Sequence, residues 1–405
     1  MRFLRRISTR RLLSLCAAVL AIAVGGTAVA MATAGEGSKP PPESLPVAVH
    51  DALSAPSVPG ISARVQLTNR LLGAPGIEGQ GSDPFLSGAS GRLWASPDGR
   101  LRLELQSEGG GGDGQVLIDE GHFEIYDGGS STVYRGALPA GSGSNRGSGS
   151  SHQPPSLEQV EQAISRLGAH STLSGATPSD VAGQPTYTVR IEPKSNGGLL
   201  GGAEVAWDAV HGTPLRAALY AKGDSTPVIQ LEATEVSFEE VSPSVFEITP
   251  PPGTQVVNLS PPSGSSGEGS GAGPSPLTGA AAVQKQLSFN LSAPASLAGM
   301  AQDEVRAIQV GEKTGALLTY GKGLGGIAVL ESPSAPGNGQ GASKTGASET
   351  ETGGLSLPTV SIDGTVAEEL ETALGTVLRF SRGGVDYVVA GLVPPATAEA
   401  AARGL

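Results

Sequence analysis

The chain has 405 residues, of which 60 are glycine and 31 are proline. Together these two types make up 22% of the chain, against ~12% in an average protein, and this excess rules out one uninterrupted compact fold. Hydrophobic residues amount to 38% and aromatic residues to 4%. That is enough for one or two packed domains, so the rest of the chain must be linker.

Charge and cysteine content exclude further classes of protein. The chain has 26 Lys and Arg against 38 Asp and Glu, a net charge of −12. Five arginines lie within residues 1–11, so 21 basic and 38 acidic residues remain and the rest of the chain carries −17. Phosphate backbones repel such a body, so we expect no nucleic acid as a partner. Cys16 is the single cysteine, which excludes a disulfide framework and a thiolate metal site.

The amino terminus has the pattern of an export signal or a membrane anchor. Residues 12–34 follow the arginines and form 23 residues without a charge, whereas a helix needs ~20 apolar residues to cross a bilayer. Signal-peptidase sites of the A-x-A type are also present, at Ala28, Ala30, Ala32 and Ala34. We therefore expect 1–34 to be a cleaved signal peptide or a retained anchor. Either outcome makes the body extracytoplasmic, membrane-anchored or secreted.

A polar spacer at residues 35–42 precedes a short amphipathic helix, predicted over 45–54. Half-buried antiparallel strands are predicted next, because apolar and polar residues alternate in four stretches, 61–68, 100–106, 116–119 and 123–126. Gly and Asp clusters between these stretches supply the turns of a meander.

A flexible loop is expected at residues 137–155, which are rich in Gly and Ser. A helix is predicted over 156–168, capped by Ser156 with Gln159 and ended by Gly168. Strand patterns resume in four stretches, 185–193, 202–212, 214–224 and 228–241. The first unit therefore comprises residues 43–258.

A Gly/Ser/Pro-rich linker over 259–280 separates the first unit from the second. Residues 281–405 have several strand patterns and a final Ala-rich helix, which predicts a small α+β domain. A polar insertion at 332–354 interrupts this domain and is expected to be disordered.

The order of elements in the first unit, and residues 204–257 in particular, resemble the LolA-like superfamily. The matching residues are Trp207 and Asp208 at a strand end, Pro214 opening the next strand, and Phe246 before the run 250–253. This superfamily includes periplasmic lipoprotein carriers, LppX-type lipid-binding lipoproteins and the sensor domain of RseB-type regulators. The resemblance implies a half-open barrel whose concave face, plugged by helices, holds acyl chains.

The second unit resembles an accessory module attached to anchored actinobacterial proteins of this kind, on the strand 387–391 before the Ala-rich helix. We therefore predict an α+β protein that is mainly antiparallel β, a LolA-like half-open barrel with a helical plug followed by a small C-terminal α+β domain.

The candidate lipid-binding groove is a set of apolar strand residues, Val65, Leu67, Leu103, Leu105, Val116, Ile118, Phe123, Ile125, Val189, Ile191, Val205, Trp207 and Leu219. For each residue alone, packing in the core is the better explanation, so only the whole set can form a groove. An acyl chain gains ~0.8 kcal/mol for each CH₂ that it buries, so even a modest groove retains one.

No arrangement of residues that carries catalysis is found in the sequence. G-x-G-x-x-G occurs at Gly109 and at Gly321, but both stretches continue into strands and not helices, which indicates hairpin turns. The five histidines are scattered, so no metal site is expected, and His211 is expected on the surface. Paired acids such as Glu368 and Glu369 are expected on a polar surface. We predict no cofactor and no enzymatic activity.

These observations favour an exported, membrane-tethered binding protein that holds a lipid or lipoprotein acyl chain in the apolar groove. Its expected partners are that chain, the membrane through the N-terminal segment, and an envelope protein. The alternative keeps the fold and makes the chain an RseB-like envelope-stress sensor that regulates an anchored signalling partner.

Overall fold

The computed structural model describes residues 39–72, 84–107, 112–119, 121–138, 154–194, 198–248, 250–259, 278–310, 313–334 and 357–405. The predicted signal or anchor, 1–34, lies outside the described residues, as do most of loop 137–155, linker 259–280 and insertion 332–354. Within the described ranges, no helix combines the length and the apolar character that crossing a membrane requires.

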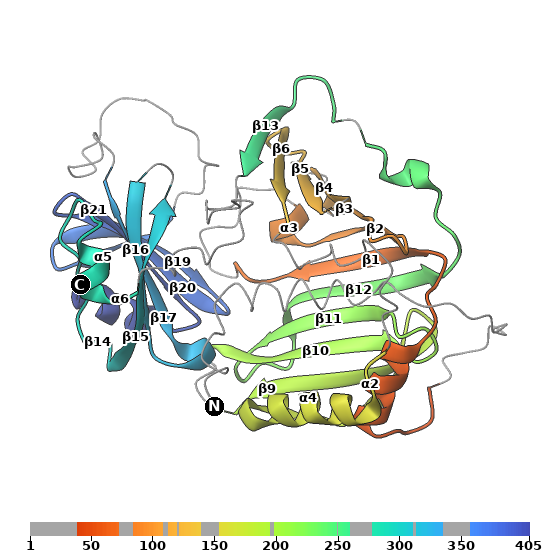
Figure 1. Cartoon of the computed structure of the whole chain (residues 1–405). Helices are drawn as coiled ribbons and strands as arrows, with labels where there is room; N and C mark the ends of the chain where they lie inside the picture. Colours follow the sequence, from red (N-terminus) through yellow and green to blue (C-terminus); the bar gives the residue numbers. More distant parts are fainter. Residues whose placement is uncertain are drawn as a thin grey trace, which may run out of the picture.

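The two predicted sets of four strands each lie in one 13-stranded sheet, together with five strands that were not predicted (Figure 1). Its order is β13-β6-β5-β4-β3-β2-β1-β12-β11-β10-β9-β7, with β8 paired to β9 off this path. The strands are β1 (Ile61–Asn69), β2 (Ala89–Ala95), β3 (Leu101–Ser107), β4 (Asp113–Asp119), β5 (His122–Asp127), β6 (Thr132–Ala137), β7 (Ser171–Leu173), β8 (Thr177–Val181), β9 (Gln184–Pro193), β10 (Leu200–Asp208), β11 (Pro214–Ala221), β12 (Pro227–Ser237) and β13 (Gln255–Leu259). The sets join where β1 pairs with β12, far apart in sequence.

The sheet is strongly curved, as Figure 1 shows. Its pairing register shifts at four places in the central strands: at Arg64/Val65 in β1, at Leu200/Gly202 and Ala206/Trp207 in β10, and at Leu219/Tyr220 in β11. An extra residue on one strand bends that strand and increases its twist. These bulges therefore account for a bend that period-two alternation alone does not predict.

Two short helices cover the face of the sheet that we call the inner face. Helix α2 (Leu45–Ser54) places Ala48 against Tyr187 and Trp207. Helix α3 (Pro84–Ser87) places Phe85 against Gly114, where a Cβ atom would lie 2.5 Å from the ring. Glycine at position 114 is therefore required by packing and not by a turn.

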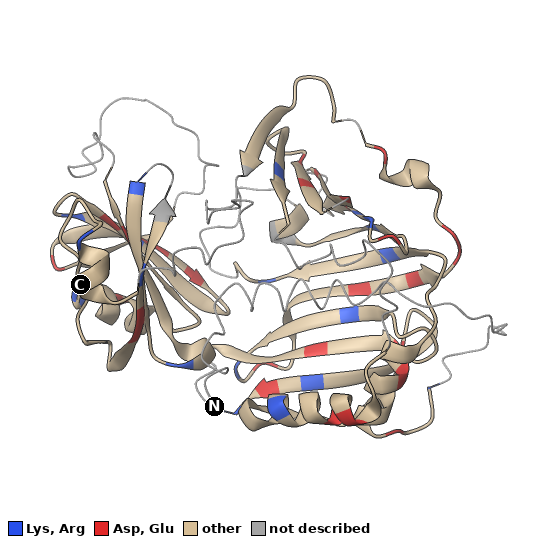
Figure 2. Cartoon of the chain, in the orientation of Figure 1, with Lys and Arg blue, Asp and Glu red and all other residues tan. Residues whose placement is uncertain are grey.

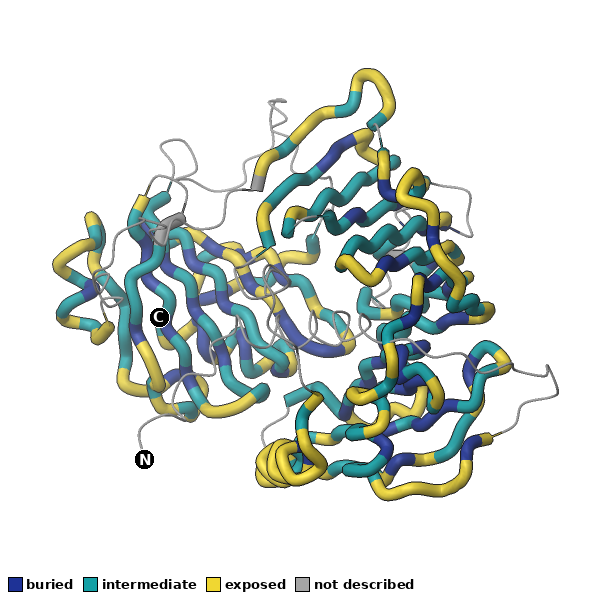
Figure 3. Tube along the Cα trace, turned by 45° about the vertical axis from the view of Figure 1, so that its right-hand side comes forward, coloured by how far each residue is buried: buried dark blue, intermediate teal, exposed yellow. Residues whose placement is uncertain are grey.

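Helix α4 (Leu157–His170) begins as predicted, with a capping box between Ser156 and Gln159. The predicted end at Gly168 is wrong, because the helix continues to His170 and passes directly into β7. The side chain of Val160 is buried, whereas those of Leu157 and Leu167 are exposed. Figure 3 shows exposed positions along this helix and at the turns.

The described residues 238–248 and 250–254, which we call the strap, lie between β12 and β13, and the strap packs on the opposite, outer face of the sheet before β13 pairs in parallel with β6. The short 3₁₀ helix η1 (Pro243–Phe246) lies in the strap. Phe246 packs with Leu117 and Trp94, and the guanidinium of Arg100 lies 4.8 Å from the Phe246 ring centre. The parallel strand β13 was not predicted, because the sequence patterns indicated antiparallel strands only.

The second unit is an 8-stranded sheet of order β14-β15-β16-β17-β21-β20-β19-β18. Its elements are α5 (Ala280–Gln284), β14 (Ser296–Leu297), β15 (Met300–Val310), β16 (Lys313–Tyr320), η2 (Gly323–Gly325), β17 (Ile327–Pro333), β18 (Thr359–Ile362), β19 (Thr365–Thr372), β20 (Gly375–Arg382), β21 (Val385–Gly391) and α6 (Pro395–Arg403). Helices α5 and α6 pack on one face over the core. The predicted α+β class is therefore confirmed for both units.

Two expectations for the second unit need correction. Ser332 and Pro333, assigned to the insertion, belong to β17. Glu369, expected on a polar surface, is 7% exposed, since it lies two residues from Ala367 and shares the core face of β19 with it. No expectation from the sequence concerned Glu331, which is also fully buried. As predicted, the glycines from Gly321 lie in a turn between two antiparallel strands.

Among the described residues, backbone hydrogen bonds link the two sheets at two points. The amide of Leu199 donates to the carbonyl of Leu392 at 2.7 Å, and that of Ala373 donates to Leu71 at 3.0 Å. Leu71 follows β1 and Leu199 precedes β10, so both contacts start beside strands of the curved sheet.

Candidate functional site

The structure brings the thirteen candidate groove residues onto one face of one sheet, the inner face. Leu103, Val116 and Ile125 form a continuous row across β3, β4 and β5. On the other arm of the sheet, Val205 lies opposite Val189 in β9. Side chains alternate along a strand, so residues two positions before or after those just named point to the same face of the sheet.

The inner face is only partly covered. Four of the thirteen residues are buried: Val65, Leu105, Val189 and Trp207. The other nine are half-buried: Leu67, Leu103, Val116, Ile118, Phe123, Ile125, Ile191, Val205 and Leu219. Half-buried aliphatic side chains offer dispersion contacts to a ligand and require no hydrogen-bonding groups from it. The buried indole nitrogen of Trp207 has no hydrogen-bond partner among the described residues.

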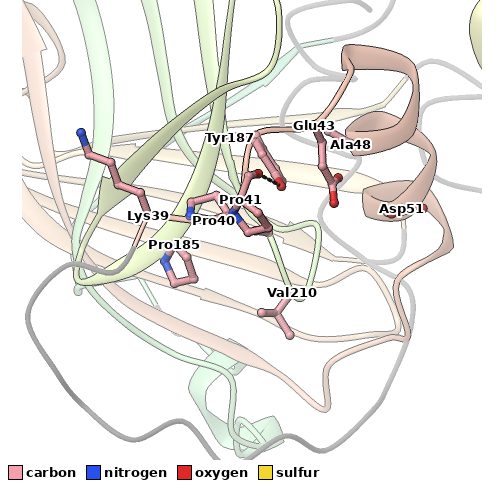
Figure 4. Close-up of a pocket in the computed structure, with 10 residues that line it drawn as sticks. Lys39, Pro40, Pro41, Glu43, Ala48, Asp51, Pro185, Tyr187 and Val210 are labelled. Atoms are coloured by element: carbon pink, nitrogen blue, oxygen red, sulfur yellow. Dashed lines mark hydrogen bonds between the residues drawn. The ribbon is translucent and has the colours of Figure 1, made fainter.

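A cavity of about 370 Å³ opens where α2 lies over β9 (Figure 4). Tyr187 and Ala48 line it and also belong to the apolar cluster of the inner face. The Tyr187 hydroxyl donates to the carbonyl of Pro41 at 2.7 Å. Burial, and then the nearby Glu43 carboxylate, raise the pKa of this hydroxyl. The end of the predicted spacer is thus fastened to the sheet at the margin of the inner face.

A larger cavity, about 750 Å³, lies on the outer face beneath the strap, and we call it the outer cavity. Its floor is a cross-strand row on β1 to β6, namely Arg64, Arg92, Glu104, Gln115, Tyr126 and Val133. Strap residues Ile248, Pro250 and Pro251 border it. Of the candidate groove residues, only Val65 and Leu105 touch this cavity.

Sequence reasoning missed the outer cavity because the polar side of each strand was interpreted as a solvated surface. The alternation did place Arg64, Glu104 and Tyr126 together on the polar side. What the sequence did not reveal is the strap that crosses this side and encloses it.

Ion pairs hold much of the outer face in place. Arg102 pairs with Glu104 and donates to the carbonyl of Val245 in the strap at 2.6 Å. The Arg135 side chain lies 2.9 Å from the Glu124 carboxylate. Acidic and basic residues alternate over the strands and do not gather into one large patch (Figure 2). The outer face is therefore a mixed polar surface and not a site for a polyanion.

The predicted surface position of His211 is not observed. The half-buried His211 ring lies 2.8 Å from the fully buried Asp208 carboxylate and 4.0 Å, between ring centres, from Phe238. Asp208 also accepts the backbone amides of Val210 and His211. This pair fixes the turn between β10 and β11.

No family model and no curated protein matches the sequence. Among solved structures, the chain is similar to MucB in the Pseudomonas aeruginosa MucA/MucB complex, at 16% identity and TM-score 0.39, covering 88% of this chain and 95% of that one. It is also similar to an uncharacterised conserved protein from Thermus thermophilus, at 14% identity and TM-score 0.32, covering 53% and 96%.

A putative outer membrane lipoprotein-sorting protein domain from Vibrio parahaemolyticus is 12% identical at TM-score 0.18, covering 50% of this chain and 95% of that one. The first unit has the architecture that the resemblance to the LolA-like superfamily implies, a curved antiparallel sheet with helices on its inner face. This likeness concerns the fold alone.

Proposed function

We propose that the chain is an exported binding protein whose inner face holds the acyl chain of a lipid or lipoprotein, and that it is not an enzyme. The observation that carries this proposal is the set of nine half-buried apolar residues that share the inner face. A bound hydrocarbon removes this surface from water, at ~25 cal/mol for each Å² buried.

The inner face also offers one polar group to such a ligand. The Trp207 indole nitrogen is buried and has no acceptor among the described residues, and leaving a buried donor unpaired is costly. The ester or amide oxygen at the head of an acyl chain is an acceptor of the kind this donor lacks. The extracytoplasmic location rests on the N-terminal segment 1–34.

The two tryptophans allow a direct test, because Trp207 lies on the inner face and Trp94 on the outer face of the same sheet. In the full chain with Trp94→Phe, dibromostearate should quench Trp207 emission at micromolar concentration, and stearate should compete. Ile191→Gln should weaken binding about tenfold, since it places an amide among the half-buried aliphatic residues. The matched control Val366→Gln, at an exposed position of the second sheet, should leave binding unchanged.

Failure of dibromostearate to quench Trp207, or equal quenching of Trp94 in the Trp207→Phe variant, would contradict the proposal. Equal affinity of the Ile191→Gln and unmodified chains would also contradict it.

A sensor role is the second candidate, favoured by the two backbone contacts between the sheets. Leu71 and Leu199 flank strands of the curved sheet and bind Ala373 and Leu392 of the second one. Filling the inner face would displace these segments and so report occupancy to the second unit and to an envelope protein bound there. Stearate should then change hydrogen exchange at the two donating amides, those of Ala373 and Leu199, whereas a simple carrier leaves it unchanged.

A further inference from the structure

The outer cavity lies on the opposite face of the sheet from the proposed acyl site, so a ligand there is independent of the acyl ligand. Its volume of about 750 Å³ is within the usual range of small-molecule sites. Charged, amide and phenolic side chains form its floor, and the strap adds Ile248 and Pro250 as apolar contacts. The ligand must therefore combine many hydrogen-bonding groups with some apolar surface.

One end of this cavity is positively charged. Arg64 of β1 lies directly opposite Arg92 of β2 in the sheet, and like charges in opposite cross-strand positions are destabilising. Arg64 pairs with Glu235 at 2.9 Å, but no ion pair joins Arg92 to a carboxylate in the described part of the chain. An anionic group placed between the two guanidinium groups would relieve their repulsion and accept charge-assisted hydrogen bonds.

The carboxylates near this end are already engaged or further away. Glu104, opposite Arg92 on β3, pairs with Arg102. Glu124 is held by Arg135, and Asp113 lies on β4, two strands from Arg92. Of the described arginines that line the cavity, Arg92 is therefore the one without a carboxylate partner.

The other end of the cross-strand row on the cavity floor has side chains that can bind sugar rings. Gln115 on β4 and Tyr126 on β5 follow Glu104 across the sheet, and neighbouring strands are ~4.8 Å apart, so Arg92 and Tyr126 are separated by ~14 Å. Carboxylate and amide groups bond hydroxyls, while the Tyr126 ring and the prolines of the strap offer flat apolar surfaces to C–H groups.

We propose that the outer cavity binds an acidic saccharide, with its carboxylate or phosphate between Arg64 and Arg92 and its sugar rings along the row towards Tyr126. This site is distinct from the proposed acyl site, and either can exist without the other.

The test uses the full chain with Trp207→Phe, which leaves Trp94 as the only tryptophan. Trp94 lies on the outer face, with the Arg102 guanidinium 5.6 Å from its ring. Cellobiouronic acid and glucose 1-phosphate represent the two kinds of anionic group, while cellobiose and inorganic phosphate are the controls. At least one acidic saccharide should change Trp94 emission and release or absorb heat in a titration, and its affinity should fall as salt increases.

Arg92→Gln and Arg64→Gln should each weaken this binding about tenfold. Both residues are exposed, so neither change should disturb folding, which near-ultraviolet circular dichroism would verify. Arg379→Gln, at an exposed arginine of the second sheet, is the matched control and should have no effect.

Equal binding of cellobiose and cellobiouronic acid would overturn the anionic end of the site. Equal binding of inorganic phosphate and glucose 1-phosphate would overturn the proposal that the site binds sugar rings. Unchanged affinity in both arginine variants would overturn the placement of the anionic group between Arg64 and Arg92. No heat from any probe at millimolar concentration would refute the site as a whole. The dibromostearate result is unaffected by any of these outcomes, so the two proposals fail separately.

Discussion

Glu331→Gln should make the second sheet more stable at neutral and alkaline pH. The Glu331 side chain is fully buried, one carboxylate oxygen accepts the amide of Ser292 at 3.0 Å, and the other has no partner among the described residues. Burial raises the pKa of this carboxyl from 4.5 to about 7, and the Ser292 bond only partly opposes the shift. Glutamine resembles the protonated acid and carries no charge to bury.

The size and sign of the effect follow from linkage between protonation and folding. Below pH 4.5 the acid is protonated in both the folded and the unfolded chain, so its titration does not affect stability. Between pH 4.5 and about 7 the unfolded chain releases the proton first, which lowers stability by ~1.4 kcal/mol for each pH unit. The loss reaches about 3 kcal/mol above pH 7. Burial raises the pKa of neighbouring Tyr320 and Tyr387, so both stay neutral in this window.

Both tryptophans lie in the first sheet, so fluorescence does not follow the second sheet. Urea unfolding with pulsed hydrogen exchange, read from peptides of β16, β17 and β21 between pH 4.5 and 8, measures the free energy of unfolding of the second sheet in the full chain. The variant should match the unmodified protein near pH 4.5 and exceed it by about 3 kcal/mol at pH 8. Glu304→Gln, at an exposed glutamate of the same sheet, is the control and should keep the native pH dependence.

The reasoning would be refuted if Glu331→Gln and the unmodified protein lost stability equally between pH 5 and 8. It would also be refuted if the variant were the less stable of the two at pH 8.

The remaining predictions concern packing. Phe246→Ala should cost the first sheet about 3 kcal/mol in urea unfolding followed by tryptophan fluorescence, because this ring of the strap is buried against the outer face of the sheet. Val366→Ala, at a 59% exposed position, should change stability by no more than about 0.5 kcal/mol. Ser156→Ala should remove the capping box and destabilise α4 by about 1 kcal/mol, seen as faster hydrogen exchange in that helix. Gly198→Ala should loosen the contact between the sheets, since φ is +62° and the new Cβ would lie 1.7 Å from the Leu392 carbonyl oxygen. Unchanged hydrogen exchange at the amide of Leu199, which donates to that carbonyl, would contradict this.

Some features could be predicted because they are local. Period-two alternation assigned Leu103, Val116 and Val189 to the apolar side of their strands, and the structure places all three on the inner face. The Ser156 and Gln159 cap likewise depends on residues three apart. The proposed saccharide site was partly predicted in the same way, because alternation also put Arg64 and Glu104 on the polar side of their strands, whereas Arg92 lies in a strand that no pattern predicted.

The sequence by itself determined eight of the thirteen strands of the first sheet and which side of each of these is apolar, because side-chain direction depends only on position along the strand. Tertiary structure alone decided that β1 pairs with β12, that β13 returns in parallel beside β6, and that the strap encloses the outer cavity. It also decided that Glu331 is buried. Pairing and enclosure depend on the free energy of contacts between residues distant in sequence, set against the entropy of closing the intervening loops, and no local pattern records that balance.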